Sequence, residues 1–309
     1  MIGNTAFPRH KRDHASPLIF VLSIAMPFFC TSCQAENRPV STPVAVSPTL
    51  VGTWQVTEVQ IDQGDSHRKQ TTDHEYNVHQ FLGRVFSFTP QLITTNAPEE
   101  KRCENPKIIS TRITALELVS KSLASRGFSP NRPGPKDFQL PLADNESVEA
   151  LSVLCKDELW NKNLGGGLGK NVGLKGAWIV VLKNEQLALR WDDEAILILR
   201  RLPQDAKPVA SFDCKKASIE AEKSICQSVA LASLDESVAQ TYKFALAYFK
   251  TQKASAKLDG LRKSQKEWLA QRNACAADTA CLEKTMETRI EDLEYEVAEY
   301  GYERRTSGR

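Results

Sequence analysis

The spacing of hydrophobic residues along the chain changes between Leu202 and Val209. From Leu50 to Leu202, apolar residues alternate with polar ones or form short β-rich runs, whereas beyond Val209 they recur every three or four positions. Alternation is typical of strands, and the longer step is typical of amphipathic helices. The pattern therefore predicts an α+β protein of two domains: an antiparallel β-barrel or sandwich, followed by an antiparallel helical bundle.

Five segments of the first region have strand character. Polar turns separate the last three of them, which predicts an antiparallel meander. Leu187, Leu189 and Trp191 alternate with Ala188 and Arg190, which predicts a strand with one buried face. Between residues 103 and 176 the pattern predicts fewer strands. The five predicted strands are Trp54–Ile61, Val85–Phe88, Ala177–Leu182, Leu187–Trp191 and Ala195–Leu199.

Three longer apolar stripes follow in the second region, with a short helix predicted before them. Each stripe places apolar residues at three- and four-residue steps, as one face of a helix does. The stripes are Leu231–Phe249, Leu258–Arg272 and Leu282–Tyr300, and the turns between them are expected near Thr251–Lys257 and Asn273–Ala280. Short connections of this kind favour antiparallel neighbours in a bundle.

The N-terminus has the pattern of an export signal. A basic start, Arg9–Arg12, precedes an apolar run of thirteen residues, Pro17–Phe29. That run is shorter than the ~20 residues needed to span a bilayer and suits a signal-peptide core. We expect residues 1–35 to be removed after Ala35, or Cys33 to be the lipid-modified first residue of a lipoprotein. Residues 36–49, rich in Pro, Ser, Thr and Val, are expected to form a tether.

Cysteine usage also indicates export, while composition excludes some partners. Of eight cysteines, Cys30 and Cys33 lie in or beside the signal, which leaves six. An even set in an exported chain predicts disulfides. These six include no C-x-x-C pair, and all five histidines precede residue 80, which argues against zinc. The net charge of +2 gives no reason to expect nucleic-acid binding.

The positions of the last four cysteines favour local pairing. Cys214 with Cys226, and Cys275 with Cys281, each lie in or beside one short element, although four cysteines permit three connectivities. A third bridge, Cys103–Cys155, would attach the middle insertion to the β-domain.

The sequence around these cysteines resembles the LprI-type lysozyme-inhibitor domain of bacterial envelope proteins. The resemblance covers residues 211–293. It implies a helical domain that binds and obstructs a muramidase, and it implies structural roles for Leu234, Asp235, Tyr242, Trp268, Arg272 and Arg289. The other matching residues are Phe212, Cys214, Ser218, Glu222, Lys223, Ile225, Cys226, Gln265, Leu269, Cys275, Cys281, Leu282, Ile290 and Leu293.

An acidic run in the last helix is the candidate partner-binding surface. Between Leu282 and Glu303 there are eight acidic residues against two basic ones, a net charge of −6. A solvated helix face is the simpler interpretation. The functional one is an electrostatic docking surface for a cationic lysozyme. The candidate contact residues are Glu283, Glu287, Glu291 and Glu294.

Signals for catalysis, cofactors and metals are weak. Residues 165–170 read GGGLGK, but Leu164 and Asn171 stand where a phosphate-binding loop needs Gly and Ser or Thr. His67, His74 and His79 have spacings that suit a solvated loop better than a chelate. No G-x-S-x-G elbow or Ser-His-Asp set is recognisable. We expect no enzymatic activity and no cofactor.

These observations predict an envelope protein that is located in the periplasm or anchored to the outer membrane by a lipid. Its expected function is the inhibition of lysozyme. The opening Gly52-Thr53-Trp54 resembles the G-x-W start of lipocalin-like barrels, so a small-ligand binder is one alternative. An interaction module without inhibitory activity is another. The expected division is a signal peptide (1–35), a tether (36–49), a β-rich lipocalin-like domain (50–202), a linker (203–208) and an LprI-like helical domain (209–303).

Overall fold

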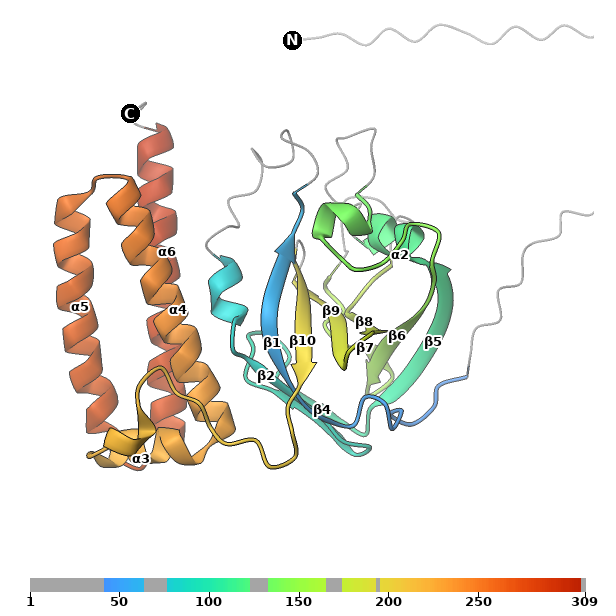
Figure 1. Ribbon diagram of the computed structural model, residues 1–309, viewed down its shortest axis with the longest axis horizontal. Helices are drawn as coiled ribbons and strands as arrows, with labels where there is room; N and C mark the ends of the chain where they lie inside the picture. The colour runs from blue at the N-terminus through green and yellow to red at the C-terminus, as the bar shows by residue number, and fades with distance from the viewer. Residues whose placement is uncertain (1–41, 64–76, 123–132, 165–173, 193–194, 307–309) are drawn as a thin grey trace, which may run out of the picture. The chain divides into compact units, whose positions relative to one another are not determined.

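The computed structural model describes residues 42–63, 77–122, 133–164, 174–192 and 195–306 (Figure 1). The described residues belong to one compact unit of α+β architecture. The signal-peptide prediction, Cys30 and Cys33 lie outside them. Among the described residues, no helix combines the length and the apolar composition that crossing a membrane requires.

Ten strands form one antiparallel sheet, which curls into a half-barrel. Its strand order is β4-β3-β2-β1-β10-β9-β8-β6-β5, with β7 paired to β6. The predicted meander is confirmed, because β8, β9 and β10 are neighbours in sequence and in the sheet. The strands are β1 (Gly52–Ile61), β2 (Val85–Phe88), β3 (Leu92–Thr95), β4 (Arg102–Glu104), β5 (Lys107–Thr114), β6 (Ser147–Cys155), β7 (Glu158–Leu159), β8 (Trp178–Leu182), β9 (Gln186–Asp192) and β10 (Ala195–Arg201).

A disulfide joins the two ends of the curled sheet. Cys103 lies in β4, the strand at one edge, and Cys155 ends β6, which is next to the strand at the other edge. The bridge spans 52 residues of sequence. The sequence predicts that this bridge attaches the middle insertion to the β-domain. In the structure it instead connects the two ends of the whole curled sheet.

Aromatic side chains fill the concave side of the sheet. Trp160 and Trp191 pack edge to face at 4.7 Å between ring centroids, and Phe86 lies 5.1 Å from Trp191. Trp54 is 1 % exposed, and the guanidinium of Arg201 lies 4.1 Å from its ring centroid. The interior is therefore a packed core.

The convex face of β8–β10 is also buried, which corrects the prediction of one exposed face. The helix α2 (Ala115–Ser122) and the 3-10 helix η4 (Pro135–Phe138) contribute to a second apolar cluster that includes Ala188. Arg190 is fully buried there and donates to the carbonyl of Leu174 at 3.0 Å. Strands buried on both faces read as continuous apolar runs, as β8 and β10 do.

Part of the expected tether belongs to the sheet. Val44 pairs with Ile108 of β5 through two backbone hydrogen bonds of 2.9 and 2.7 Å. Val46 is 5 % exposed and packs in the core on the concave side. The described half of this Pro-rich segment, from Thr42, is thus anchored.

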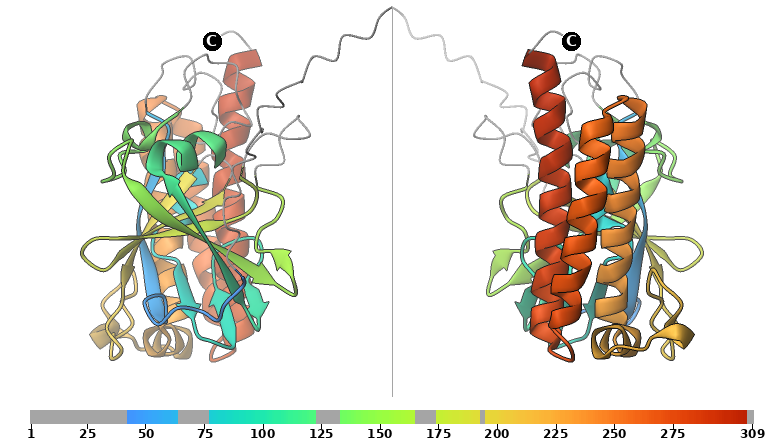
Figure 2. Two further views of the ribbon diagram at one scale, coloured as in Figure 1. Left: turned by 90° about the vertical axis from the view of Figure 1, so that its right-hand side faces the viewer. Right: turned by 90° about the vertical axis from the view of Figure 1, so that its left-hand side faces the viewer.

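Three long helices lie side by side next to the sheet (Figures 1 and 2). Their apolar stripes form two clusters, one near α3 and one near the other ends of the long helices. The predicted positions of these helices and of their turns are confirmed. The remaining elements are η2 (Asn77–Phe81), η5 (Cys214–Lys216), α3 (Glu220–Gln227), α4 (Val229–Thr251), α5 (Ser255–Ala274) and α6 (Thr279–Thr306).

Candidate functional site

A buried ion pair connects α4 to α5. Nη1 of Arg272 lies 3.2 Å from Oδ1 of Asp235, and their side chains are 6 % and 2 % exposed. Oδ2 of Asp235 accepts the backbone N–H of Ser211 at 2.8 Å. The guanidinium of Arg272 also lies within 6 Å of the rings of Phe212 and Trp268. Ser211 thus meets Asp235, 24 positions later in the chain, and Arg272, 61 positions later, at one point, which we call the Asp235–Arg272 node.

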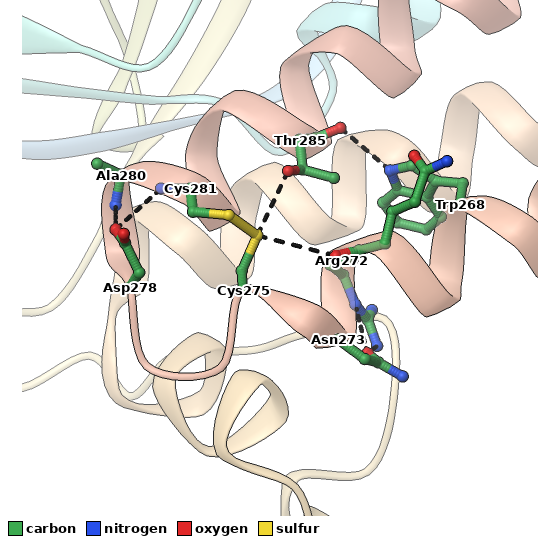
Figure 3. Close-up of a disulfide and its surroundings, with 9 residues drawn as sticks. Trp268, Arg272, Asn273, Cys275, Asp278, Ala280, Cys281 and Thr285 are labelled. Carbon is green, nitrogen blue, oxygen red and sulfur yellow. Dashed lines mark hydrogen bonds between the residues drawn. A yellow bond between two sulfur atoms is a disulfide. The ribbon is translucent and has the colours of Figure 1, made fainter.

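The Cys275–Cys281 disulfide lies beside this node (Figure 3). It closes the turn between α5 and α6, where Oδ1 of Asp278 accepts the backbone N–H groups of Ala280 and Cys281 at 3.0 Å. Nε1 of Trp268 donates to the carbonyl of Thr285 at 3.0 Å, which ties α5 to α6. These contacts fix the start of α6 against α5.

A second polar contact joins α5 to α6 farther along. Nε of Arg289 donates to Oε1 of Gln265 at 2.9 Å, and Nη2 donates to Oγ of Ser264 at 3.1 Å. Glu296 lies 3.9 Å from the guanidinium. Burial lowers the pKa of Arg289 below its ordinary value and raises that of Glu296 above its own.

The residues with structural roles implied by the resemblance are therefore interior or half-buried. Leu234 is fully buried, and Tyr242 packs against the second helical cluster. Cys214 is bonded to Cys226 between η5 and α3, and Cys275 to Cys281, so the last four cysteines pair locally, as favoured from sequence. None of these groups forms an exposed reactive constellation within the described residues.

Part of the acidic run of α6 faces the sheet. Glu283, Glu287 and Glu294 are spaced by four and seven residues and share one face of the helix. Glu287 forms an ion pair with Lys101, which lies just before β4. Glu287, one of the residues predicted to contact a cationic partner, is thus already paired with Lys101 of the same chain.

Arg84, just before β2, is the second cation at this boundary. It is 2 % exposed, and its guanidinium donates to the carbonyls of Gln80, at 2.7 Å, and Asn96. Burial lowers its pKa to about 10, although the nearby carboxylates of Glu287, Glu294, Glu283 and Glu291 oppose this shift. Arg84 therefore stays charged at neutral pH and balances the acidic face electrostatically.

Neutral hydrogen bonds complete the boundary between the sheet and α4. Nδ2 of Asn96 donates to the carbonyl of Ala230 at 2.9 Å and to Oγ of Ser233 at 2.7 Å. Oγ of Ser237 donates to the carbonyl of Leu82 at 2.6 Å. Buried polar contacts of this kind specify how two surfaces fit together. Arg84, Lys101 and Asn96 are not recognisable from sequence as residues of this boundary. No local pattern marks their contacts with helices that follow so much later in the chain.

A solvent-exposed side of α6 carries four other carboxylates together with two exposed tyrosines. Tyr295 and Tyr302, seven residues apart, are 66 % and 64 % exposed. Glu291, Asp292 and Glu303 are exposed around them, and the hydroxyl of Tyr295 donates to Glu299 at 3.3 Å. We call these six residues the outer face of α6. The exposure of this face was predictable from the sequence, because both tyrosines fall outside the apolar stripe of the helix.

A cleft of about 320 Å³ lies between the sheet and the helices. Strands β1–β3 form one wall, the first two turns of α4 form another, and Glu283 of α6 contributes a carboxylate. Polar and apolar side chains both line it. The lining residues are Thr53, Val85, Ser87, Thr94, Thr95, Asn96, Val229, Ala230, Leu231, Leu234 and Glu283.

The described residues contain no group of three metal-ligating side chains. His79 stacks on Phe244 of α4, with 4.2 Å between ring centroids. His67, His74 and the glycine-rich stretch 165–170 lie outside the described residues.

Comparisons with known proteins returned no match of any kind. No family model, curated protein or solved structure matches the chain.

Proposed function

We propose that the protein is an exported bacterial envelope protein that binds and inhibits a cationic muramidase. The β-rich part would form one domain, and residues 209–303 would form a helical-bundle domain that carries the inhibitory surface. The outer face of α6 is the observation that carries this proposal. It combines exposed aromatic rings with several carboxylates on one face of a helix.

This combination suits the recognition of a basic protein. Exposed carboxylates attract a cationic partner from a distance and raise its association rate. Tyr295 and Tyr302 supply amphipathic contact area, and tyrosine is enriched among the residues that dominate binding energy. Glu287 is engaged with Lys101, so the docking surface proposed from sequence moves from the side of α6 facing the sheet to the outer face.

The resemblance to LprI-type inhibitors gives the proposal its enzyme class. Phe212, Asp235, Trp268 and Arg272 are among its matching residues, and they meet at the Asp235–Arg272 node. A set of matching residues that packs at one point supports a shared structural framework. Structural similarity alone does not transfer an activity, which is why an assay is needed.

The packed interior of the sheet argues against the small-ligand alternative. Trp160 and Trp191 are almost completely buried, as are Phe86 and Phe88. A ligand inside the curl would have to displace these rings, at a cost of several kcal/mol of lost packing. The second candidate is an interaction module without inhibitory activity, which the same outer face of α6 would serve.

An inhibition assay with surface variants tests the proposal. The mature full-length protein is added to c-type, g-type and i-type lysozymes, and residual activity is measured. We expect inhibition of at least one class. The double substitution Tyr295→Ala and Tyr302→Ala should weaken it at least tenfold, since each hot-spot side chain contributes more than about 1 kcal/mol.

Val181→Ala provides the matched control, because Val181 is 46 % exposed on β8, away from α6. It should leave inhibition unchanged. Full inhibition by the double tyrosine variant would place the contact surface elsewhere. Binding to a partner without any loss of enzyme activity would favour the interaction module.

A further inference from the structure

The cleft between the sheet and the helices contains an ordered row of hydroxyl groups. Thr53 of β1 is paired with Ser87 of β2, and Ser87 is paired with Thr94 of β3. Directly paired residues of adjacent strands project to the same face of a sheet. Three neighbouring strands thus each present one hydroxyl to the cleft, opposite the side that carries Phe86 and Phe88.

Glu283 contributes a negative charge to this cleft. In the described part of the chain, no hydrogen bond or ion pair joins its side chain to another residue. Arg84 gives its hydrogen bonds to the carbonyls of Gln80 and Asn96. Lys101 is paired with Glu287, one turn along the helix. Neither cation of the boundary is thus hydrogen-bonded or ion-paired to Glu283, although Arg84 lies near enough for the carboxylate of Glu283 to raise its pKa.

The remaining walls are apolar. Val85 comes from the sheet, and Val229, Leu231 and Leu234 come from the first two turns of α4. Such surfaces suit an aliphatic chain, because the burial of methylene groups away from water is favourable. The volume, about 320 Å³, lies at the lower end of the range for ligand pockets and fits a small molecule.

The charge excludes some ligand classes. Arg84 lies near Glu283 but also near Glu287, Glu291 and Glu294, so the carboxylates of this region outnumber the cations Arg84 and Lys101 and repel anions. The N-terminus of α4 adds only about half a unit of positive charge. The lining residues include no aromatic ring on which a sugar could stack. A primary ammonium group fits better, because it has three donors and no acceptor. Glu283 and the hydroxyls of Ser87 and Thr94 would each accept one hydrogen bond.

We propose that this cleft binds a small aliphatic amine, with the ammonium group held by Glu283, Ser87 and Thr94 and the aliphatic chain along α4. Aliphatic amines are the ligand class of matching chemistry, and in a diamine such as cadaverine the second ammonium group would remain in solvent. The lining of this cleft shares no residue with the outer face of α6, so the two proposals are tested separately.

Isothermal titration of the mature full-length protein with cadaverine tests the site. We expect saturable binding that weakens with salt, and at least tenfold weaker binding of the uncharged analogue pentanediol. Glu283→Gln keeps the side chain's shape and removes its charge, so it should weaken cadaverine binding at least tenfold. Ser87→Ala should weaken it by a smaller factor while leaving the charge in place.

Glu303→Gln is the matched control, because it removes one carboxylate from the same helix at an exposed position. It should leave cadaverine affinity unchanged. Equal weakening by Glu303→Gln would reduce the effect to non-specific attraction and overturn the proposal. Pentanediol binding as tight as cadaverine binding would also overturn it, as would no saturation at about 10 mM cadaverine.

Discussion

Asp235 of α4 and Arg272 of α5 form an ion pair of 3.2 Å that is almost completely shielded from solvent. Burying two charges is costly, so such a pair persists only when its other polar atoms are also satisfied. Here the second carboxylate oxygen accepts the backbone N–H of Ser211, and Arg272 also donates to Oδ1 of Asn273. The node thereby fixes the chain entering α3 relative to both long helices.

Asp235→Asn should destabilise the protein strongly. The change preserves shape but leaves the buried guanidinium of Arg272 without its counter-charge, which typically costs about 3–5 kcal/mol. Chemical denaturation of the mature protein measures the free energy of unfolding. Arg262→Met breaks an exposed pair with Asp259 on α5 and should cost under about 1 kcal/mol. Equal losses in the two variants would show that the node has no special role.

The Cys103–Cys155 bridge should stabilise the curled sheet. Replacing both cysteines with serine removes a link between its two ends, and the loss of a native disulfide typically costs about 2–5 kcal/mol. Thermal unfolding monitored by circular dichroism would measure this. An unchanged unfolding temperature in the double serine variant would mean that strand pairing alone holds the two ends together.

Arg84→Met should weaken the boundary between the sheet and α6. It leaves the carbonyls of Gln80 and Asn96 without a donor and removes a buried charge near Glu287, so we expect a loss of about 2–4 kcal/mol. Lys101→Met is the control, because its ion pair is partly exposed and should contribute under about 1 kcal/mol. A larger loss in the Lys101 variant would contradict this ranking.

The long helices were predictable from sequence because each has a buried stripe whose period survives along its whole length. The edge strand β5 was not. Only Ile108, Ile109 and Ile113 are apolar among its eight residues, and they do not alternate cleanly because an edge strand is partly exposed on both faces. Its place in the sheet depends on pairing with β6, about 40 residues later.

The division of the acidic run into two faces was present in the spacing of its residues. The residues that each face meets were not predictable, because Arg84 and Lys101 precede the start of α6 by about 200 and about 180 residues and no local signal links them. The same limit applies to the cleft. Its hydroxyl row needs the register of three strands, which only the folded sheet defines.

Glu296 should make stability depend on pH. Burial raises its pKa above the ordinary value, Asp292 and Glu299 add to this, and Arg289 and Lys257 oppose it. A carboxyl with a raised native pKa holds its proton more tightly when folded. Its contribution to stability is therefore complete below the unfolded pKa of about 4.3 and is lost as the pH rises through the native pKa.

Glu296→Gln removes that loss. The variant should gain free energy of unfolding relative to the unsubstituted protein as the pH rises from about 4 to about 7. Urea denaturation at several pH values measures the difference. Glu303→Gln, at an exposed position, should change stability by under about 0.5 kcal/mol. A difference between the Glu296 variant and the unsubstituted protein that stays constant with pH would contradict the assignment.

The inhibitor proposal is tested most directly by titrating lysozyme activity with the purified mature protein. We predict that at least one lysozyme class loses activity in a saturable manner. The midpoint should rise with salt, because the Debye length shrinks from about 10 Å at 0.1 M to about 3 Å at 1 M. If c-type, g-type and i-type lysozymes all keep full activity at protein concentrations of about 100 μM, a weak complex by any standard, the inhibitor proposal is wrong.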